Sequence, residues 1–167
     1  KDCTGLQSIT IPRSVNHIGA GAFEGCTNLT TVYIQDVNAW CSIVFDNEYA
    51  NPLKYAENLC LENGAAITDI TISADVIAIR AYAFAGYTSL TSVTLPNSLV
   101  KIGKDAFRDC KQLKSITMQD GVTNIGDYAF YGCNSLIEIA IPDSVTAIGR
   151  RAFAFSESLT KIVIPDG

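Results

Sequence analysis

The residues with reactive side chains are one histidine, six cysteines and a short acidic run. A catalytic serine or cysteine needs a neighbouring base to take its proton, and the only histidine is His17, near the start of the chain. The run Asp46-Asn47-Glu48 lacks the alternating ligand spacing of a calcium loop, so we expect a solvated loop there. The sequence has no Cys-x-x-Cys motif, no histidine pair and no glycine-rich phosphate loop. It therefore predicts a protein without enzymatic activity, metal or cofactor.

The chain is built from a repeated sequence motif, and this repeat must position any functional side chain. The motif Leu-x-x-Ile-x-Ile starts at Leu6 and recurs, with Ile, Val, Leu or Met at its apolar positions, from 29, 67, 90, 113, 136 and 159. Successive copies are 23 residues apart except for one step of 38. A second motif, Val-x-x-Ile-Gly-x-x-Ala-Phe, starts at Val15 and recurs from 76, 99, 122 and 145, with Arg80 replacing one glycine. A period of 23 lies within the range of about 20–29 residues that is typical of leucine-rich repeats.

The two motifs predict the elements of each coil. Alternating apolar residues indicate a strand with one buried face, and the proline that follows it in four copies ends the pairing. These prolines are Pro12, Pro96, Pro142 and Pro165. The second motif indicates a turn at the glycine and then a short helical or extended piece whose phenylalanine enters the core. Because one coil cannot bury its own apolar side, the coils must stack. The sequence thus predicts an α/β repeat solenoid.

The repeat resembles a known family. From Cys133 through Pro142 to Phe153 the chain reads C-x-x-L-x-x-I-x-I-P-x-S-V-x-x-I-G-x-x-A-F, which is similar to the BspA-like (Treponema-type) leucine-rich repeat. The resemblance extends from Cys3 to Gly167. It implies a right-handed leucine-rich-repeat superhelix with short strands on the concave face and short helical or extended segments on the convex face. It also implies a bacterial cell-surface or secreted protein that acts in adhesion and binding rather than in catalysis.

The whole chain, residues 1–167, is expected to be a single solenoid domain. Its length and its apolar fraction of 48% suffice for a core without disulfides or metal. Neither end carries a distinct polar cap, which solenoids need. We therefore expect a fragment of a longer array, or a chain that self-associates end to end, with any secretion signal or anchor outside it.

One repeat, spanning residues 29–66, is enlarged and irregular. Its extra residues include an Asn63-Gly64 pair, a strong signal for a hairpin. We predict a short helix or loop over 37–41, an irregular segment to Pro52, a turn of helix near 53–57 and a hairpin returning at Ile67.

The enlarged repeat also contains the only tryptophan, Trp40, together with Tyr49 and Tyr55. Two interpretations stay open for these aromatic residues. They form a small local core packed on the solenoid, or they present a binding surface to a partner, since aromatic side chains dominate the energetics of interfaces.

Four cysteines share one position of the repeat, three residues before its leading leucine. They are Cys3, Cys26, Cys110 and Cys133, and Tyr87 and Ser156 take this position in two other coils. A position that recurs in this way faces the interior, so we expect buried, unpaired thiols. A disulfide between adjacent coils would strain the stack. Whether Cys41 and Cys60 pair within the enlarged repeat is left open.

The outward positions of the strands are rich in hydroxyl groups. The two-residue period of a strand turns every second side chain outward. An extended face of this kind is the usual working surface of a solenoid, although threonine is also favoured on any exposed strand. The predicted partner-binding residues on this face are Ser8, Thr10, Thr31, Tyr33, Asp69, Thr71, Ser92, Thr94, Ser115, Thr117, Glu138 and Lys161.

The expected partner is a protein, recognised in adhesion or in contact with a host or its matrix. A formal net charge of -5 without clustered basic residues argues against nucleic acid as a partner. The sequence also has no run of about 18 apolar residues that would predict a membrane span. Two alternatives remain. A carbohydrate-binding module would expose Trp40, Tyr33 and Tyr49 together on one face, and a structural spacer would bind nothing.

Overall fold

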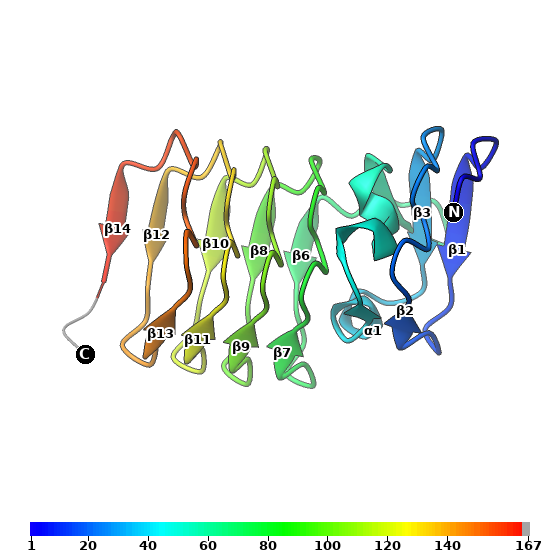
Figure 1. The fold of residues 1–167 in the computed structure, drawn as a ribbon. Helices are drawn as coiled ribbons and strands as arrows, with labels where there is room; N and C mark the ends of the chain where they lie inside the picture. The colour runs from blue at the N-terminus through cyan, green and yellow to red at the C-terminus, as the bar shows by residue number, and fades with distance from the viewer. Residues whose placement is uncertain (165–167) are drawn as a thin grey trace.

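The computed structural model describes residues 1–164 and shows coils stacked along one axis (Figure 1). Each coil begins with a strand that runs parallel to its neighbours, and the enlarged repeat contributes one more strand. The first ladder joins β1, β3 and β5, the second joins β6, β8 and β10, and the third joins β12 and β14. These strands are β1 (Ser8–Ile11), β3 (Thr31–Ile34), β5 (Asn58–Leu61), β6 (Asp69–Thr71), β8 (Ser92–Thr94), β10 (Ser115–Thr117), β12 (Glu138–Ala140) and β14 (Lys161–Val163).

The second motif forms a parallel ladder of its own rather than helices. Its isoleucines end two-residue strands, and tight turns follow them. The strands are β2 (His17–Ile18), which pairs with β4 (Val44–Phe45), and β7 (Ala78–Ile79), β9 (Lys101–Ile102), β11 (Asn124–Ile125) and β13 (Ala147–Ile148), which form one sheet. The piece after the glycine, which carries the phenylalanine and was expected to be helical or extended, is a run of tight turns. The fold is the predicted repeat solenoid, with parallel strands and little helix. Pro165 lies outside the described residues.

Stacked phenylalanine rings form the centre of the core. Phe84, Phe107 and Phe130 are fully buried. The centroids of Phe84 and Phe107 are 5.4 Å apart, those of Phe107 and Phe130 are 5.3 Å apart, and the row continues to Phe153 at 5.5 Å. The rings are parallel to within 8°. Since strand spacing within a sheet is about 4.8 Å, the ring spacing follows from the coil spacing.

Backbone hydrogen bonds connect the turns of neighbouring coils in a regular pattern. The N–H groups of residues 82, 84 and 86 donate to the carbonyls of residues 104, 106 and 108, at 3.0, 2.8 and 2.7 Å. The same pattern recurs one coil later, where Phe107 N donates to Ala129 O at 2.8 Å. Each coil therefore needs a neighbour both for its apolar side and for its backbone polar groups.

The enlarged repeat takes the place of a coil in this pattern. The N–H groups of Gly21, Phe23 and Gly25 donate to Asn47 Oδ1, Tyr49 O and Tyr55 Oη, at 3.3, 3.0 and 3.1 Å. On its other side, the indole N–H of Trp40 donates to Ala83 O at 2.7 Å. Side chains thus replace part of the backbone ladder where the repeat is interrupted.

The elements of the enlarged repeat agree in part with the prediction. The helix α1 (Val37–Cys41) has the predicted bounds, and Asp36 caps its first turn by accepting from Asn38 N at 2.9 Å. The hairpin at Asn63-Gly64 is confirmed, since Leu61 N donates to Ala65 O at 2.9 Å. The short 3-10 helix η2 (Pro52–Lys54) falls at the start of the predicted helical turn. A second one, η1 (Glu48–Ala50), lies in the segment expected to be irregular, and 58–61 forms β5. The periodicity did not indicate that strand.

Truncation of a central ring tests the stacked core. We expect Phe107→Ala to lower the free energy of unfolding by about 3–5 kcal/mol, because the cavity lies between two rings that cannot collapse onto it. Phe155→Ala is the control, since this ring is 63% exposed. Chemical denaturation measures both variants. Equal losses in the two variants would contradict a core built on the phenylalanine stack.

Asn51 tests the contribution of side chains to the interrupted ladder. It is fully buried; its Nδ2 donates to Tyr82 O at 2.5 Å and its Oδ1 accepts from Leu53 N at 2.9 Å. Asn51→Ala leaves both partners buried, so we expect a loss of about 1–3 kcal/mol in unfolding free energy. The exposed Asn97→Ala serves as the control in the same denaturation experiment. A loss no larger than that of the control would show that the contact between the enlarged repeat and the next coil does not depend on the Asn51 side chain.

Candidate functional site

The strand face has the alternation that the motif predicts. Thr71, Thr94 and Thr117 are exposed and lie in register on β6, β8 and β10. The residues that precede them, Ile70, Val93 and Ile116, are buried. The other predicted residues are exposed at Ser8, Thr10, Asp69, Ser115, Glu138 and Lys161 and half-buried at Thr31, Tyr33 and Ser92. Their role in binding stays a prediction.

Asp69 organises hydroxyl groups at one edge of this face. Its Oδ1 accepts from Thr91 Oγ1 at 2.8 Å and from Ser92 Oγ at 2.5 Å, and its Oδ2 accepts from Thr68 Oγ1 at 3.0 Å. These bonds, that from Ser92 foremost, lower the pKa of the Asp69 carboxyl. The carboxylate therefore fixes the neighbouring hydroxyls in place.

The strand face is hollowed between β10 and β12. Among the described strands, these two neighbours belong to separate sheets. An open depression of about 580 Å³ lies over them, and its lining includes the charged residues Lys114, Glu138 and Lys161 as well as Ser115 and Thr117. This hollow lies at one of the two breaks in the ladder of described strands; the other is between β5 and β6.

Trp40 does not belong to a binding surface, which corrects the alternative prediction. Its side chain is 1% exposed and packs against Phe45, with ring centroids 5.3 Å apart. Tyr55 is half-buried, and its hydroxyl accepts from Gly25 N. Only Tyr49, at 38%, remains exposed. Trp40, Tyr33 and Tyr49 therefore do not form the shared aromatic face expected of a carbohydrate-binding module.

The repeated cysteine position faces the interior, as predicted, except in the first coil. Cys26, Cys110 and Cys133 are buried, whereas Cys3 is exposed because a neighbouring coil packs on one side of it only. The thiols of Cys110 and Cys133 donate to Phe84 O and Phe107 O, both at 3.2 Å. Burial raises the pKa of Cys133 to about 12. Cys41 and Cys60 are buried and free, so they do not pair.

The acidic run is partly exposed, as expected of a solvated loop, but its side chains are paired. Asp46 Oδ1 lies 2.8 Å from His17 Nε2, and its Oδ2 accepts from Ala20 N at 3.2 Å. The hydrogen bond with His17 lowers the pKa of the Asp46 carboxyl. Asn47 caps η1, and Glu48 Oε2 lies 2.6 Å from Lys54 Nζ. The run therefore connects the enlarged repeat to the first coil, and His17 pairs with a carboxylate rather than with a nucleophile.

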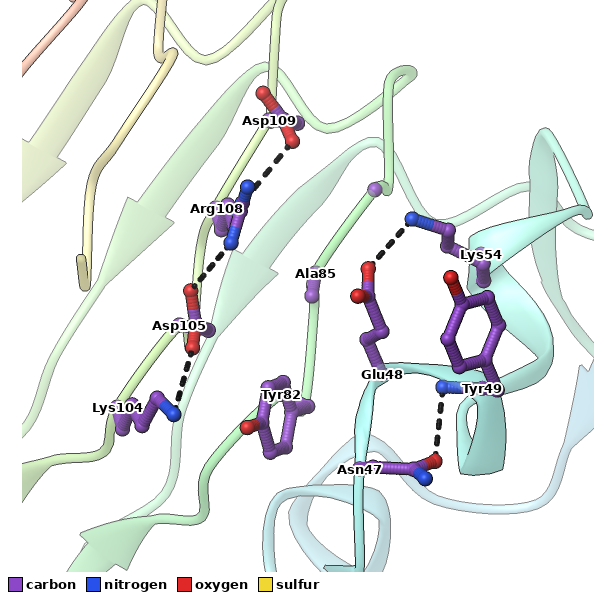
Figure 2. Close-up of a pocket in the computed structure, with 11 residues that line it drawn as sticks. Asn47, Glu48, Tyr49, Lys54, Tyr82, Ala85, Lys104, Asp105, Arg108 and Asp109 are labelled. Carbon is purple, nitrogen blue, oxygen red and sulfur yellow. Dashed lines mark hydrogen bonds and ion pairs between the residues drawn. The ribbon is translucent and has the colours of Figure 1, made fainter. Parts of the chain in front are cut away.

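A cleft that the sequence did not indicate lies between the enlarged repeat and the turns of two regular coils (Figure 2). Its volume is about 220 Å³. One wall comes from the segment around η1 and η2, and the other comes from the turns that surround Phe84 and Phe107. The lining residues are Asn47, Glu48, Tyr49, Lys54, Tyr82, Ala85, Gly86, Lys104, Asp105, Arg108 and Asp109.

The charges of the cleft are paired. The side chain of Asp105 is only 3% exposed; its Oδ1 accepts from Arg108 Nη1 at 3.3 Å, and its Oδ2 lies 3.8 Å from Lys104 Nζ. Burial raises the pKa of the Asp105 carboxyl, although Arg108 and Lys104 oppose this effect. Asp109 Oδ2 lies 3.4 Å from Arg108 Nε. The cleft thus holds polar groups of both signs that already have partners.

Within residues 1–164, no group of three or more His, Cys, Asp or Glu side chains is arranged to hold a metal ion. No helix in the same range is long and apolar enough to cross a membrane.

The fold defines the class of protein: a repeat solenoid of the leucine-rich-repeat type. A family model described as the BspA type leucine rich repeat region matches residues 1–53 and 54–167, with six copies. The chain belongs to this family. No curated protein sequence matches it.

Solved structures share the fold. The pneumococcal vaccine antigen PcpA is 19% identical, with a TM-score of 0.65 over 94% of this chain and 50% of its own. A leucine-rich repeat protein from Bacteroides ovatus is 29% identical, with a TM-score of 0.58 over 95% of this chain and 37% of its own. A leucine rich cell surface protein from Faecalibacterium prausnitzii is 22% identical, with a TM-score of 0.54 over 96% and 60%. The chain spans about half the length of these proteins, or less in one case.

The burial of the cysteines can be tested by thiol labelling. We expect one thiol, that of Cys3, to react promptly with a thiol reagent in the folded protein, and the other five only after denaturation, because the reagent needs an accessible thiolate. Cys3→Ser removes the fast reaction and serves as the control. Prompt labelling of two or more thiols would contradict the buried positions.

Proposed function

We propose that this chain is a non-enzymatic binding module of a bacterial cell-surface or secreted protein, and that it recognises a protein partner through the strand face. The observation that carries the proposal is the row of exposed Thr71, Thr94 and Thr117, held in register on a parallel ladder. A role in adhesion, through contact with a host protein or matrix, is the form of recognition that we infer.

The rigidity of the face favours binding. Thr94 sits on β8, which pairs on both sides, and Thr71 and Thr117 sit on β6 and β10, which each pair with β8. The backbone under the row is therefore held by the ladder, so little conformational freedom is lost when a partner docks. Hydroxyl groups both donate and accept hydrogen bonds, which suits the polar surface of a folded protein. The Asp69 cluster adds hydroxyls that are already oriented.

The hollow between β10 and β12 supplies a second feature of protein interfaces. Interface energy is concentrated where a side chain of one partner fills a pocket of the other. Lys114, Glu138 and Lys161 line the hollow and offer charges of both signs to a contact. A projecting side chain of the partner would enter this hollow while the flat threonine row contacts the surrounding surface.

The location at the cell surface is supported by one of the similar structures, which is described as a cell surface protein, and by the pneumococcal vaccine antigen. Both are below 25% identity, so they contribute the fold, and the location is part of the proposal. The absence of catalysis rests likewise on the family and on the pairing of His17 with Asp46.

A charge substitution on the strand face tests the proposal. The intact domain is screened for binding to matrix proteins and to a polysaccharide array, together with a variant in which Thr71, Thr94 and Thr117 are changed to lysine. We expect a protein ligand whose affinity falls by at least about tenfold in this variant, because three lysines disturb the centre of the contact. Surface plasmon resonance measures the affinities.

A second triple variant controls for the added charge. Thr27, Gln112 and Ser158 are exposed residues in the loops that precede the strands, and their change to lysine adds the same charge elsewhere. Its affinity should match that of the unmodified domain. Equal losses in both variants would point to a general charge effect, and binding that survives the threonine changes would move the site away from this face. No ligand at all, with the fold intact, would favour a structural spacer.

A further inference from the structure

The cleft of Figure 2 has the size of a site for one small ring. Its volume of about 220 Å³ lies below the range of about 300–1,000 Å³ that is typical of pockets for drug-sized ligands. Its walls come from two different parts of the chain, since Tyr49 and Lys54 project from the enlarged repeat and Tyr82, Lys104 and Asp105 from the regular turns (Figure 2). A ring that enters it is therefore contacted from both sides.

The electrostatics of the cleft favour a neutral ligand that carries hydroxyl groups. The lining contains three carboxylates and three cationic side chains, and close pairs join Glu48 to Lys54 and Asp105 to Arg108. A charged ligand would have to compete with one of these pairs. A hydroxyl group can donate to a carboxylate and accept from an ammonium or guanidinium group at the same time, so it binds without breaking them.

Two tyrosines give the cleft its apolar contact surface. The ring of Tyr49 has Lys54 Nζ at 5.4 Å from its centroid, and the ring of Tyr82 has Lys104 Nζ at 5.7 Å. These cation–π contacts restrain the rings. Aromatic faces pack on apolar C–H surfaces, and a sugar ring presents such a surface on one side and hydroxyls around its edge.

The backbone at Tyr82 has the left-handed conformation that the repeat requires at this position. Its φ is 65°, and the equivalent residue of the first coil is Gly21, with φ 68°. Glycine adopts this left-handed conformation without strain, whereas a tyrosine does not. Asp105 holds the same position one coil later, with φ 53°. The same conformation recurs at Tyr128 and Arg151, outside the cleft, so it is a property of the repeat. At Tyr82 it places a ring, where the first coil has only glycine, in the lining of the cleft.

Aromatic and cationic side chains continue beyond the cleft along the same turns. Arg108 Cζ lies 4.9 Å from the ring centroid of Tyr131, and Arg150 Cζ lies 5.2 Å from that of Tyr128. The rings of Tyr131 and Phe155 are 5.0 Å apart. This row offers further stacking surfaces, one coil after another, to a ligand longer than a single ring.

We propose that the cleft binds one residue of a neutral oligosaccharide, between Tyr49 and Tyr82, and that the next sugar residues lie over Tyr128 and Tyr131. The carboxylate of Glu48 accepts from its hydroxyls, while Lys104 and Arg108 donate to them. Asp105, whose side chain is 3% exposed, holds Arg108 in place. This site is separate from the strand face, and it does not depend on the protein partner proposed for that face.

Replacement of a strained residue by glycine provides a sharp test. Tyr82→Gly removes the ring and relieves the backbone. The relief offsets part of the packing that a half-buried ring loses, so the variant should stay folded. Arg151→Gly is the matched control, because Arg151 holds the equivalent position in a later coil, with φ 54°, and does not line the cleft. Both variants and the unmodified domain are applied to an array of neutral, acidic and amino-bearing oligosaccharides, and each ligand found is titrated by calorimetry.

We expect a neutral oligosaccharide to bind the unmodified domain, with affinity at least about tenfold weaker in Tyr82→Gly and unchanged in Arg151→Gly. The variant with lysines at Thr71, Thr94 and Thr117 should bind it normally, which separates this site from the strand face. Three outcomes would overturn the proposal: equal affinity of the two glycine variants, binding of charged oligosaccharides only, or no oligosaccharide bound by the folded domain.

Discussion

The structure depends on one requirement, which is that every coil is completed by its neighbours. The apolar side of a coil is covered only when the phenylalanine of the next coil stacks on the phenylalanine of this one. The ring centroids of Phe84 and Phe107, for example, are 5.4 Å apart. The backbone of the turns is satisfied only when N–H groups such as that of Phe84 reach a carbonyl of the following coil. Both conditions impose the same spacing, so side chains at equivalent positions align in straight rows across the surface.

The enlarged repeat shows what is needed when that requirement cannot be met by repetition. Its backbone leaves the regular path, and side chains take over the missing contacts, with Trp40 and Asn51 donating to Ala83 O. The departure also leaves a space that regular coils would close. The cleft beside Tyr49 and Tyr82 is therefore a consequence of the way in which the interruption is accommodated.

The periodic part of the fold could be predicted from the sequence, because each position of the repeat occurs several times. The residue type that recurs at a position indicates whether that position is buried or exposed. The buried rows at Ile70, Val93 and Ile116 followed from the strand motif. The enlarged repeat occurs once and carries no such signal. The partner of Trp40 lies at Ala83, 43 residues further along the chain, and no local pattern indicates it. The cleft was missed for the same reason, because one of its walls comes from the enlarged repeat.

One strained backbone position in the turns accepts different side chains from coil to coil. The left-handed position before the core phenylalanine is held by Gly21, Tyr82, Asp105, Tyr128 and Arg151 in different coils, with φ between 53° and 68°. The stack imposes this backbone whatever residue is present, since the core and the ladder contribute more than the strain costs. A solenoid can therefore change the aromatic or charged groups on its turns coil by coil while its fold stays the same. The strand face obeys the same rule, because its outward residues contribute little to the core, so that two separate surfaces can specialise for different ligands on one rigid support.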